Sequence, residues 1–451
     1  MKRQITEQLT LFASVIKWTV YASLVGVLVG LGTTGFLRSL AWSSRQIGAY
    51  PDYYMFLPLT ILVSAALVKW LAPDAAGHGT EKVIEAVHKR MGKIPLAVVP
   101  VKLVATVITL AGGGSAGKEG PCAQIGAGLA SALADLLRVD DEERRKLVIC
   151  GISAGFATVF GTPIAGALFG VEVLVLGQMF YEVLFPSFVA GIVGYHVATA
   201  LGVHYPHAVT SILPQLTGWS FLEIIMLGVC CGLIALMLIE LMKLGHKFFE
   251  RIPLHWSLKA LLGGVLLVLL GRFVSIDYLG LGLNSIEVGL RGEALPASAL
   301  FWKSLTTSIT LGSGGSGGIL TPIFFIGTAT GNLFAQLFNP TFLAAFSAIG
   351  MVALLAGSAN TPIAASVMAM ELFGPQIAPY AAIACMVSFL IVGYRSIYPS
   401  QLLGIQKSAS LIMPTGNPIG ISGRATYLPR DKTLLKRLLT AFGAYRNRRR
   451  K

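Results

Sequence analysis

The chain has 451 residues, of which 54% are hydrophobic and only 12% are charged, and its mean hydropathy is +0.72. A soluble globular domain carries about 25% charged residues, so this composition excludes an ordinary soluble protein. It indicates a polytopic membrane protein.

Apolar runs that are able to cross a membrane recur along the chain, and several are short or broken by Gly and Pro. They cover residues 11–37, 54–72, 95–111, 147–175, 183–202, 221–242, 258–271, 322–338, 342–373 and 376–394. Such breaks are tolerated at membrane depth only where protein or water satisfies the freed backbone groups. We therefore expect tilted and half-crossing helices in one membrane domain, residues 1–413, followed by a basic cytoplasmic tail, residues 414–451.

The net charge of +14 does not indicate a nucleic-acid partner, because the basic residues cluster in short segments that flank the apolar runs. These clusters are Met1–Arg3, His88–Lys93, Arg144–Lys146 and Lys432–Lys451. This distribution is typical of cytoplasmic loops in membrane proteins. We expect an integral membrane protein with both termini in the cytoplasm.

Two Gly-rich breaks in the apolar pattern resemble each other. The first is GGGSAGKEGPCAQIG at residues 112–126, and the second is GSGGSGGILTPIFFIG at residues 312–327. Pro121 and Pro322 hold the same place in the two copies, 201 residues apart. This duplication predicts two homologous halves, at residues 10–205 and 218–410.

A second pair of matching segments follows each break. TPIAGALFGVEV begins at Thr162 and TPIAASVMAMEL begins at Thr361, and in each a single acid lies ten residues after the Thr, at Glu172 and Glu371. The echo suggests a structural role for both acids at helix ends. A duplicated membrane chain with Gly-interrupted segments is typical of a transporter whose binding site lies between the repeats.

Each Gly-rich break is followed by a good helix, with Pro121 or Pro322 suited to its first turn. A helix N-terminus inside a membrane offers free N–H groups and a partial positive charge, which together make an anion site. In the second copy Ile319 and Leu320 stand at the helix start. Two opposed helix starts that meet near the midplane can hold a dehydrated anion.

Glu119 lies within the first Gly-rich break. Residues 112–118 also fit the G-x-x-x-x-G-K pattern of a phosphate-binding loop, but the next residue is Glu119 rather than Ser or Thr, and a carboxylate there repels phosphate. An acid inside a membrane is costly and usually functional. It can act as a tethered anion that gates the site and carries a proton, or it can be a purely structural helix cap.

These motifs resemble the CLC family of chloride channels and chloride/proton exchangers over residues 20–405. The run Gly117, Lys118, Glu119, Gly120, Pro121 matches the family's G-K/R-E-G-P element, whose Glu is the external gate. The run from Gly318 to Pro322 matches G-x-F-x-P, with Leu320 in place of Phe, where the family binds chloride through backbone amides. Tyr398 matches a tyrosine that contacts the central chloride, and Lys102, 17 residues before Glu119, matches a family lysine.

The resemblance implies an all-α inverted repeat of two halves, with about eighteen helices per subunit. It also implies a homodimer with one pore in each subunit. The anion site would include Gly117, Lys118, Gly120, Ile319, Leu320 and Tyr398. Protonation of Glu119 by external acid should open the path.

His78 departs from the family pattern. The family's first element is G-S-G-I-P, whose Ser coordinates the central chloride, and here the matching segment is Gly77, His78, Gly79, Thr80, Glu81. Either the imidazole N–H donates to the anion, or His78 points away and a backbone amide, such as that of Gly79, replaces it. Because this element is altered, fluoride or nitrate is an alternative to chloride.

The second departure concerns protons. Family exchangers often carry an internal Glu that passes protons toward the gate, and the matching residue here is Val173, while Glu172 matches the acid before it. A Val at this place is typical of family channels, so we expect a passive gated anion channel. A chloride/proton antiporter of the same fold is the alternative, in which Glu172 could substitute as a proton donor.

We expect no metal, cofactor or enzymatic activity. The five cysteines lie in apolar runs without paired metal-ligand spacing, and His196, His204 and His207 show no ligand pattern. An intramembrane enzyme would require a nucleophile–base pair that is not seen. The residues after Pro414 are too few for an appended regulatory domain, which leads us to expect a prokaryotic plasma membrane.

Overall fold

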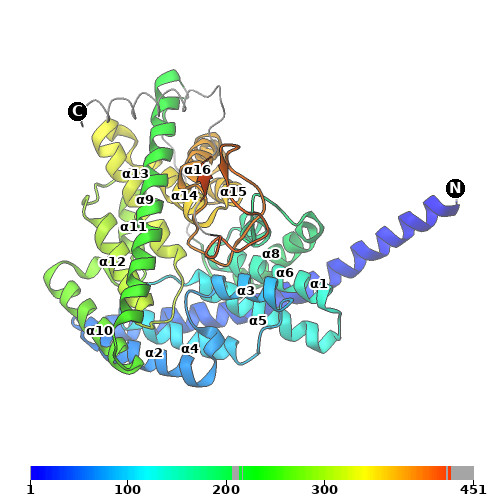
Figure 1. Cartoon of the computed structure of the whole chain (residues 1–451), viewed down its shortest axis with the longest axis horizontal. Helices are drawn as coiled ribbons and strands as arrows, with labels where there is room; N and C mark the ends of the chain where they lie inside the picture. The colour runs from blue at the N-terminus through cyan, green and yellow to red at the C-terminus, as the bar shows by residue number, and fades with distance from the viewer. Residues whose placement is uncertain (1, 206–212, 216, 423–424, 428–451) are drawn as a thin grey trace.

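The computed structural model describes residues 2–205, 213–215, 217–422 and 425–427. Within these ranges the chain forms sixteen α-helices, five short 3-10 helices and four two-residue strands (Figure 1). Seven helical segments of the described chain are long and apolar enough to cross a membrane. The predicted all-α polytopic class is confirmed, and the helix number is close to the eighteen that the resemblance implied.

The helices fall into two series with the same order, and Figure 1 shows the first series along the bottom and at the right and most of the second at the left and top. The first series is α1 (Lys2–Gly48), α2 (Leu57–Leu71), α3 (Thr80–Lys89), α4 (Val98–Ala111), α5 (Glu119–Leu137), α6 (Asp141–Phe160), α7 (Pro163–Glu172) and α8 (Tyr181–Ala200). The second is α9 (Gly218–Arg251), α10 (Trp256–Phe273), α11 (Leu283–Leu290), α12 (Ala299–Gly312), α13 (Leu320–Phe338), α14 (Leu343–Ala359), α15 (Pro362–Phe373) and α16 (Ala378–Val392).

The duplication read from the sequence is visible in how these helices pack. Helix α1 packs on α8 as α9 packs on α16, and α5 packs on α6 as α13 packs on α14. The two series also meet through equivalent helices, since α2 contacts α10 and α7 contacts α15. The turns that end α4 and α12 use glycines 201 residues apart with left-handed backbones, Gly113 at φ 97° and Gly314 at φ 107°.

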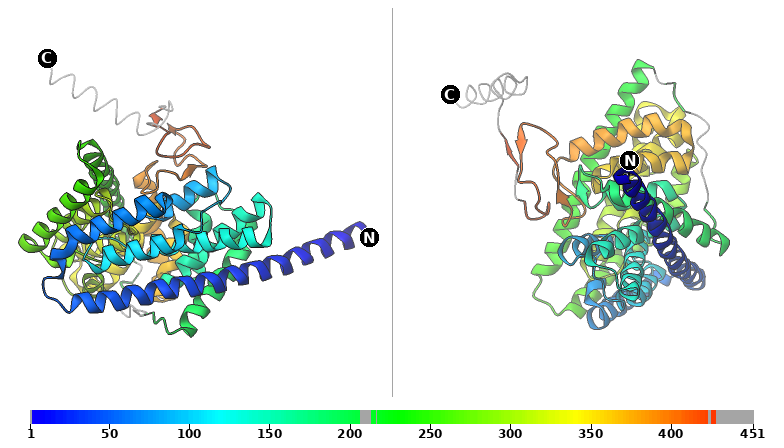
Figure 2. Two further views of the ribbon diagram at one scale, coloured as in Figure 1. Left: turned by 90° about the horizontal axis from the view of Figure 1, so that it is seen from below. Right: turned by 90° about the vertical axis from the view of Figure 1, so that its right-hand side faces the viewer.

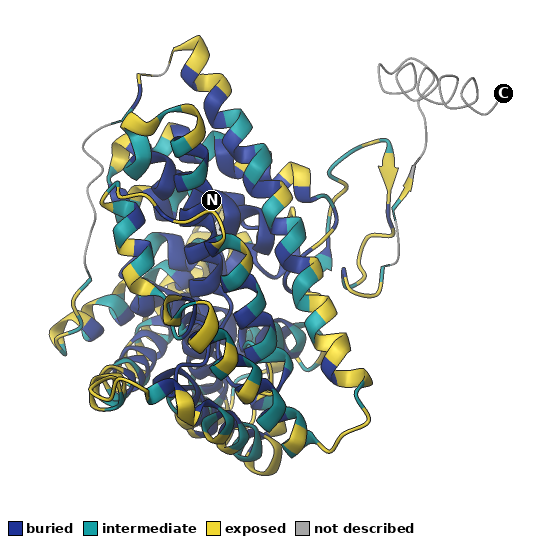
Figure 3. Ribbon diagram, turned by 90° about the vertical axis from the view of Figure 1, so that its left-hand side faces the viewer, coloured by how far each residue is buried: buried dark blue, intermediate teal, exposed yellow. Residues whose placement is uncertain are grey.

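Helices α5, α6, α13 and α14 form the buried centre, drawn dark blue in Figure 3. Glycines at equivalent places allow their backbones to approach closely. A Cβ on Gly126 of α5 would lie 2.3 Å from the Gly151 carbonyl oxygen of α6, and one on Gly327 of α13 would lie 2.6 Å from that of Gly350 in α14. Small residues at helix crossings are the usual basis of tight packing in membranes.

Helix α1 is longer than the apolar run from which it was predicted. It extends over 47 residues, and Figure 2 shows its N-terminal end projecting beyond the rest of the molecule. Leu9 and Phe12 in this end are 62% and 64% exposed. Apolar side chains on the outer surface of a membrane protein are suited to contact with lipid rather than water.

Short strands join the C-terminal segment to the body. Strand β1 (Val175–Leu176) pairs in parallel with β2 (Leu402–Leu403), and β3 (Leu411–Ile412) pairs antiparallel with β4 (Thr426–Tyr427). The all-α prediction did not include them. Most of the predicted basic tail, including Lys432–Lys451, lies outside the described residues, so the predicted boundary at residue 413 stays a prediction.

Candidate functional site

The two Gly-rich breaks meet in space and pair with each other. The Gly117 N–H donates to the Gly318 carbonyl at 2.7 Å, and the Gly318 N–H donates to the Gly117 carbonyl at 2.6 Å. A side chain cannot be added here, because a Cβ on Gly318 would lie 2.8 Å from the Gly120 nitrogen. This pair brings the starts of α5 and α13 together, as the repeat predicted.

Buried hydroxyls secure both breaks in the same way. The Ser115 N–H donates to Thr310 Oγ1 at 3.0 Å, and the Ser316 N–H donates to Thr109 Oγ1 at 3.1 Å. Each break is therefore anchored to the helix that precedes the other break. The sequence did not single out these residues, although the signal was present, since Thr109 and Thr310 are 201 residues apart.

Glu119, in the first turn of α5, is fully buried and reaches the start of α13. Its Oε2 accepts from the Thr321 backbone N–H at 3.0 Å, and its Oε1 accepts from the Thr321 hydroxyl. The carboxylate thus occupies the partly positive N-terminus of α13, the place where a mobile anion would bind. Ile319 and Leu320 are buried beside it at the same helix start. Thr321 was predicted only as part of a motif, not for its hydroxyl.

The segment with His78 packs directly on the start of α5. A Cβ on Gly120 would lie 2.0 Å from the His78 carbonyl oxygen, and one on Gly79, which has φ 80°, would lie 2.4 Å from the Gly120 carbonyl oxygen. Both glycines are required by this approach. Lys118, just before α5, is partly exposed, in contrast to its neighbours Gly117 and Glu119.

His78 and Tyr398 lie together, with ring centroids 5.9 Å apart. His78 Nδ1 and the Tyr398 hydroxyl are buried, and neither has a hydrogen-bond partner among the described residues. Buried polar atoms are rarely left unpaired in proteins, and both atoms can donate to an anion. The geometry agrees with the first of the two alternatives for His78, in which the side chain faces the anion.

Two buried lysines hold equivalent loops. Lys102 Nζ donates to the carbonyls of Ala75 (3.1 Å) and Gly77 (2.6 Å), just before His78. Lys303 Nζ donates to the Tyr278 and Gly280 carbonyls at 3.2 and 2.8 Å. Lys303 was missed in the sequence, although it lies 201 residues after Lys102. Lys102 thus positions the backbone that presents His78.

Each of the two repeated acids, Glu172 and Glu371, caps the N-terminus of a helix in the other half of the chain. Glu172 accepts from the N–H groups of Ile363 (3.1 Å) and Ala364 (2.8 Å) at the start of α15. Glu371 accepts from the N–H groups of Ile164 (3.0 Å) and Ala165 (2.7 Å) at the start of α7. The expected position at helix ends is therefore seen, and both Glu172 oxygens have backbone partners.

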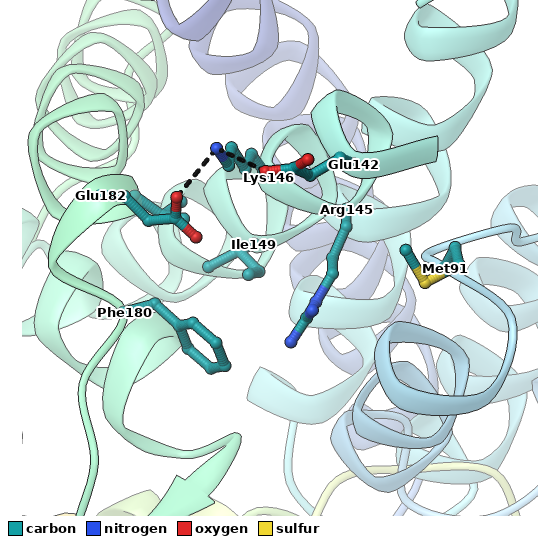
Figure 4. Close-up of a pocket in the computed structure, with 8 residues that line it drawn as sticks. Met91, Glu142, Arg145, Lys146, Ile149, Phe180 and Glu182 are labelled. Carbon is teal, nitrogen blue, oxygen red and sulfur yellow. Dashed lines mark ion pairs between the residues drawn. The ribbon is translucent and has the colours of Figure 1, made fainter. Parts of the chain in front are cut away.

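A further polar group lies where α6 and α8 begin (Figure 4). Lys146 Nζ lies 3.2 Å from Glu142 Oε1 and 2.9 Å from Glu182 Oε2, and the Arg145 guanidinium lies 4.9 Å from the Phe180 ring centroid. These residues line a pocket, and none of them is among the residues described above near Glu119. We interpret the Lys146–Glu182 ion pair as a link between α6 and α8.

No group of three potential metal ligands occurs among the described residues. His207, one of the three histidines considered above, lies outside the described residues.

Residues 60–393 match the family model described as "Voltage gated chloride channel". The chain belongs to this family, the CLC proteins. Over 410 residues this CLC chain is 39% identical to the "Chloride/fluoride channel protein" of Pseudomonas syringae pv. tomato, an alignment that covers 89% of the chain and 90% of that relative. Family members are channels or transporters of anions, so anion transport across a membrane follows from the family itself.

Solved structures resemble the CLC chain as well. A "CLC-type fluoride/proton antiporter" has a TM-score of 0.81 at 28% identity, covering 86% of this chain and 98% of that one. A "slow cyanobacterial Cl-/H+ antiporter" has a TM-score of 0.72 at 22% identity, covering 83% and 94%, and this likeness shows the fold alone. The fold predicted from the motifs is thereby confirmed.

Proposed function

We propose that this CLC protein moves a small halide, chloride or fluoride, in exchange for protons, and that Glu119 is both gate and proton carrier. The observation that supports this most directly is the buried Glu119 carboxylate at the start of α13. A halide and this carboxylate compete for the same partly positive N-terminus of α13. Halide binding therefore favours protonation of Glu119, which is the elementary link that exchange requires.

The remaining site residues have separate proposed roles. The N–H groups at Ile319 and Leu320 stabilise the anion, as do the backbones of Lys118 and Gly120 at the start of α5. Gly117, whose N–H is bound to Gly318, holds the two helix starts together. Tyr398 and His78 donate from their side chains, with Gly79 permitting the close approach of the loop. The combination suits a small halide, because it consists of N–H and O–H donors without a fully paired cation.

The choice between chloride and fluoride rests on the relatives. The names of one relative and of one similar structure include fluoride. The altered first element, with His78 in place of Ser, is consistent with a different anion preference from that of chloride-specific members. We therefore propose both halides as substrates to be compared directly.

The passive channel expected from the sequence is the second candidate. Val173 is buried, and its carbonyl accepts from Gln401 Nε2 at 3.0 Å, so no carboxylate stands at this family proton position. Exchange therefore requires a different inner proton route. Glu172 is a poor substitute, because its two oxygens already accept from the start of α15.

The deciding experiment uses purified protein in liposomes loaded with chloride or fluoride. Halide efflux and external pH are followed together, with and without a potassium ionophore that clamps the voltage. Exchange predicts that a halide gradient drives protons inward against their own gradient, and that Glu119→Gln abolishes proton movement while a halide leak persists. Halide efflux without proton movement in the wild type would make the protein a channel.

We further propose a homodimer in a prokaryotic plasma membrane, with both termini cytoplasmic. Support comes from the family resemblance and from the basic clusters that flank the spans. Cross-linking in the membrane and labelling of terminal cysteines from each side test these two points.

A further inference from the structure

Helix α3 begins two residues after His78, and its first turn carries a carboxylate, Glu81, that the sequence analysis did not single out. Glu81 Oε1 accepts from the Ser400 backbone N–H at 2.9 Å and from the Ser400 hydroxyl at 2.5 Å. Ser400 lies two residues after Tyr398. Glu81 is thus attached to the turn that presents the tyrosine hydroxyl.

The second oxygen of Glu81 is different. Its Oε2 is buried and has no hydrogen-bond partner among the described residues. The residue as a whole is nevertheless partly exposed, whereas Glu119 is fully buried. Glu85, one turn further along α3, is in contrast paired with Lys82 and Lys89 at 3.0 Å each. Glu81 is therefore a partly exposed residue whose buried Oε2 has no hydrogen-bond donor in the described chain and can take up a proton.

Two carboxylates belong to segments that contact the His78–Tyr398 pair. Glu81 binds Ser400, two residues after Tyr398, and Glu119 precedes Gly120, on which the His78 segment packs. The Tyr398 hydroxyl has no hydrogen-bond partner in the described chain. Glu119 holds the start of α13, and Glu81 lies on α3, which runs away from the cluster and ends at His88 and Lys89. Basic residues at that end indicate the cytoplasmic side.

Charged and hydroxyl groups from two segments surround Glu81. On its own helix the charged neighbours are Lys82 and Glu85. The segment packed against it supplies the Ser400 hydroxyl, and Tyr398, two residues before Ser400, lies with its ring beside that of His78. Lys82 is already paired with Glu85, and Glu81 forms no ion pair within the described chain.

We infer that Glu81 is the inner proton carrier of this protein, taking the part that Val173 cannot. The inference rests on the proposed exchange. A proton from cytoplasmic water binds Glu81 Oε2, passes by way of the Tyr398 hydroxyl or water beside it to the Glu119 carboxylate, and leaves on the other side. One O–H bond forms as another breaks at each transfer, so no other reactant is needed.

The test is Glu81→Gln in the liposome assay, with Glu85→Gln as the matched control on the same helix. A glutamine keeps an oxygen that can accept from Ser400 but cannot shuttle a proton. We expect proton flux to fall by about 100-fold, a typical contribution of a positioned acid or base, while halide flux persists. Halide flux itself shows that the variant is folded, and Glu81→Asp should restore part of the proton flux.

Each possible result has a clear meaning. Wild-type coupling together with unchanged coupling in Glu81→Gln overturns this inference and leaves the proposed exchange standing. Ser400→Ala separates carrying from positioning, because it keeps the carboxylate but loses the hydroxyl that holds it. If Ser400→Ala loses proton flux as fully as Glu81→Gln, Glu81 only positions the Tyr398 turn and the inference fails. A wild type that moves no protons overturns exchange and this inference together.

Discussion

Thr321→Val should selectively weaken the hydrogen bonding between the start of α13 and the Glu119 carboxylate. Thr321 donates both its backbone N–H and its hydroxyl to Glu119. Valine keeps the shape and the N–H but lacks the hydroxyl. A hydrogen bond to a charged group contributes about 1.5–3 kcal/mol, so the bound position of the carboxylate loses roughly that much.

The lost free energy of carboxylate binding should appear as a gain in apparent halide affinity. Every 1.4 kcal/mol is about tenfold, so 1.5–3 kcal/mol corresponds to roughly 10- to 150-fold. Because halide and carboxylate compete for the start of α13, apparent halide affinity should rise by up to this factor in Thr321→Val. Isothermal titration of chloride and fluoride into the purified protein at neutral pH measures it, and Glu119→Gln sets the upper limit.

Thr328→Val is the matched control for this prediction. Thr328 lies on the same helix, is fully buried, and its hydroxyl has no partner among the described residues. Its replacement should leave halide affinity unchanged. If Glu119→Gln tightens binding but Thr321→Val does not, the hydroxyl does not hold the gate. If neither variant tightens binding, the carboxylate does not compete with halide and the reasoning from the α13 terminus is refuted.

Three further predictions concern the scaffold. Glu172→Gln should lower the free energy of unfolding by about 1–2 kcal/mol, because a charged helix cap is lost. Thermal unfolding in detergent measures this loss. The proton-to-halide ratio should stay the same, and a changed ratio would favour a proton role for Glu172. Gly120→Ala should prevent folding, because its Cβ would lie 2.0 Å from the His78 carbonyl oxygen, whereas Gly35→Ala, with nothing within 4 Å, should elute normally on size exclusion. Lys303→Met should destabilise the fold by about 1–3 kcal/mol for each carbonyl left unpaired but leave halide affinity intact, and weakened affinity in a stable variant would contradict this.

The repeat made much of the architecture predictable from the sequence. The 201-residue offset placed Pro121 and Pro322 at equivalent helix starts, and α5 and α13 do begin there. The echo of Glu172 in Glu371 likewise indicated helix ends. What the offset could not predict is that each acid caps the opposite half, because a one-dimensional pattern does not say which ends meet.

The site was predictable where it follows motifs, and not where it depends on distant pairs. Glu119 was identified from its place in the Gly-rich break, but its partner Thr321 is 202 residues away. Glu81 binds Ser400 across 319 residues, and nothing local distinguishes it from Glu85 on the same helix. The sequence could not decide whether the His78 side chain faces the anion or points away, because its orientation depends on packing against Gly120 and Tyr398.

The reciprocal caps have a consequence for how the protein is made. A chain emerging from the ribosome completes α7 long before Glu371 exists, so the first half enters the bilayer with the start of α7 uncapped. Glu172 in turn stays without its backbone partners until α15 arrives. The first half must therefore persist as an incomplete insertion intermediate, and only synthesis of the second half allows both helix starts to be capped.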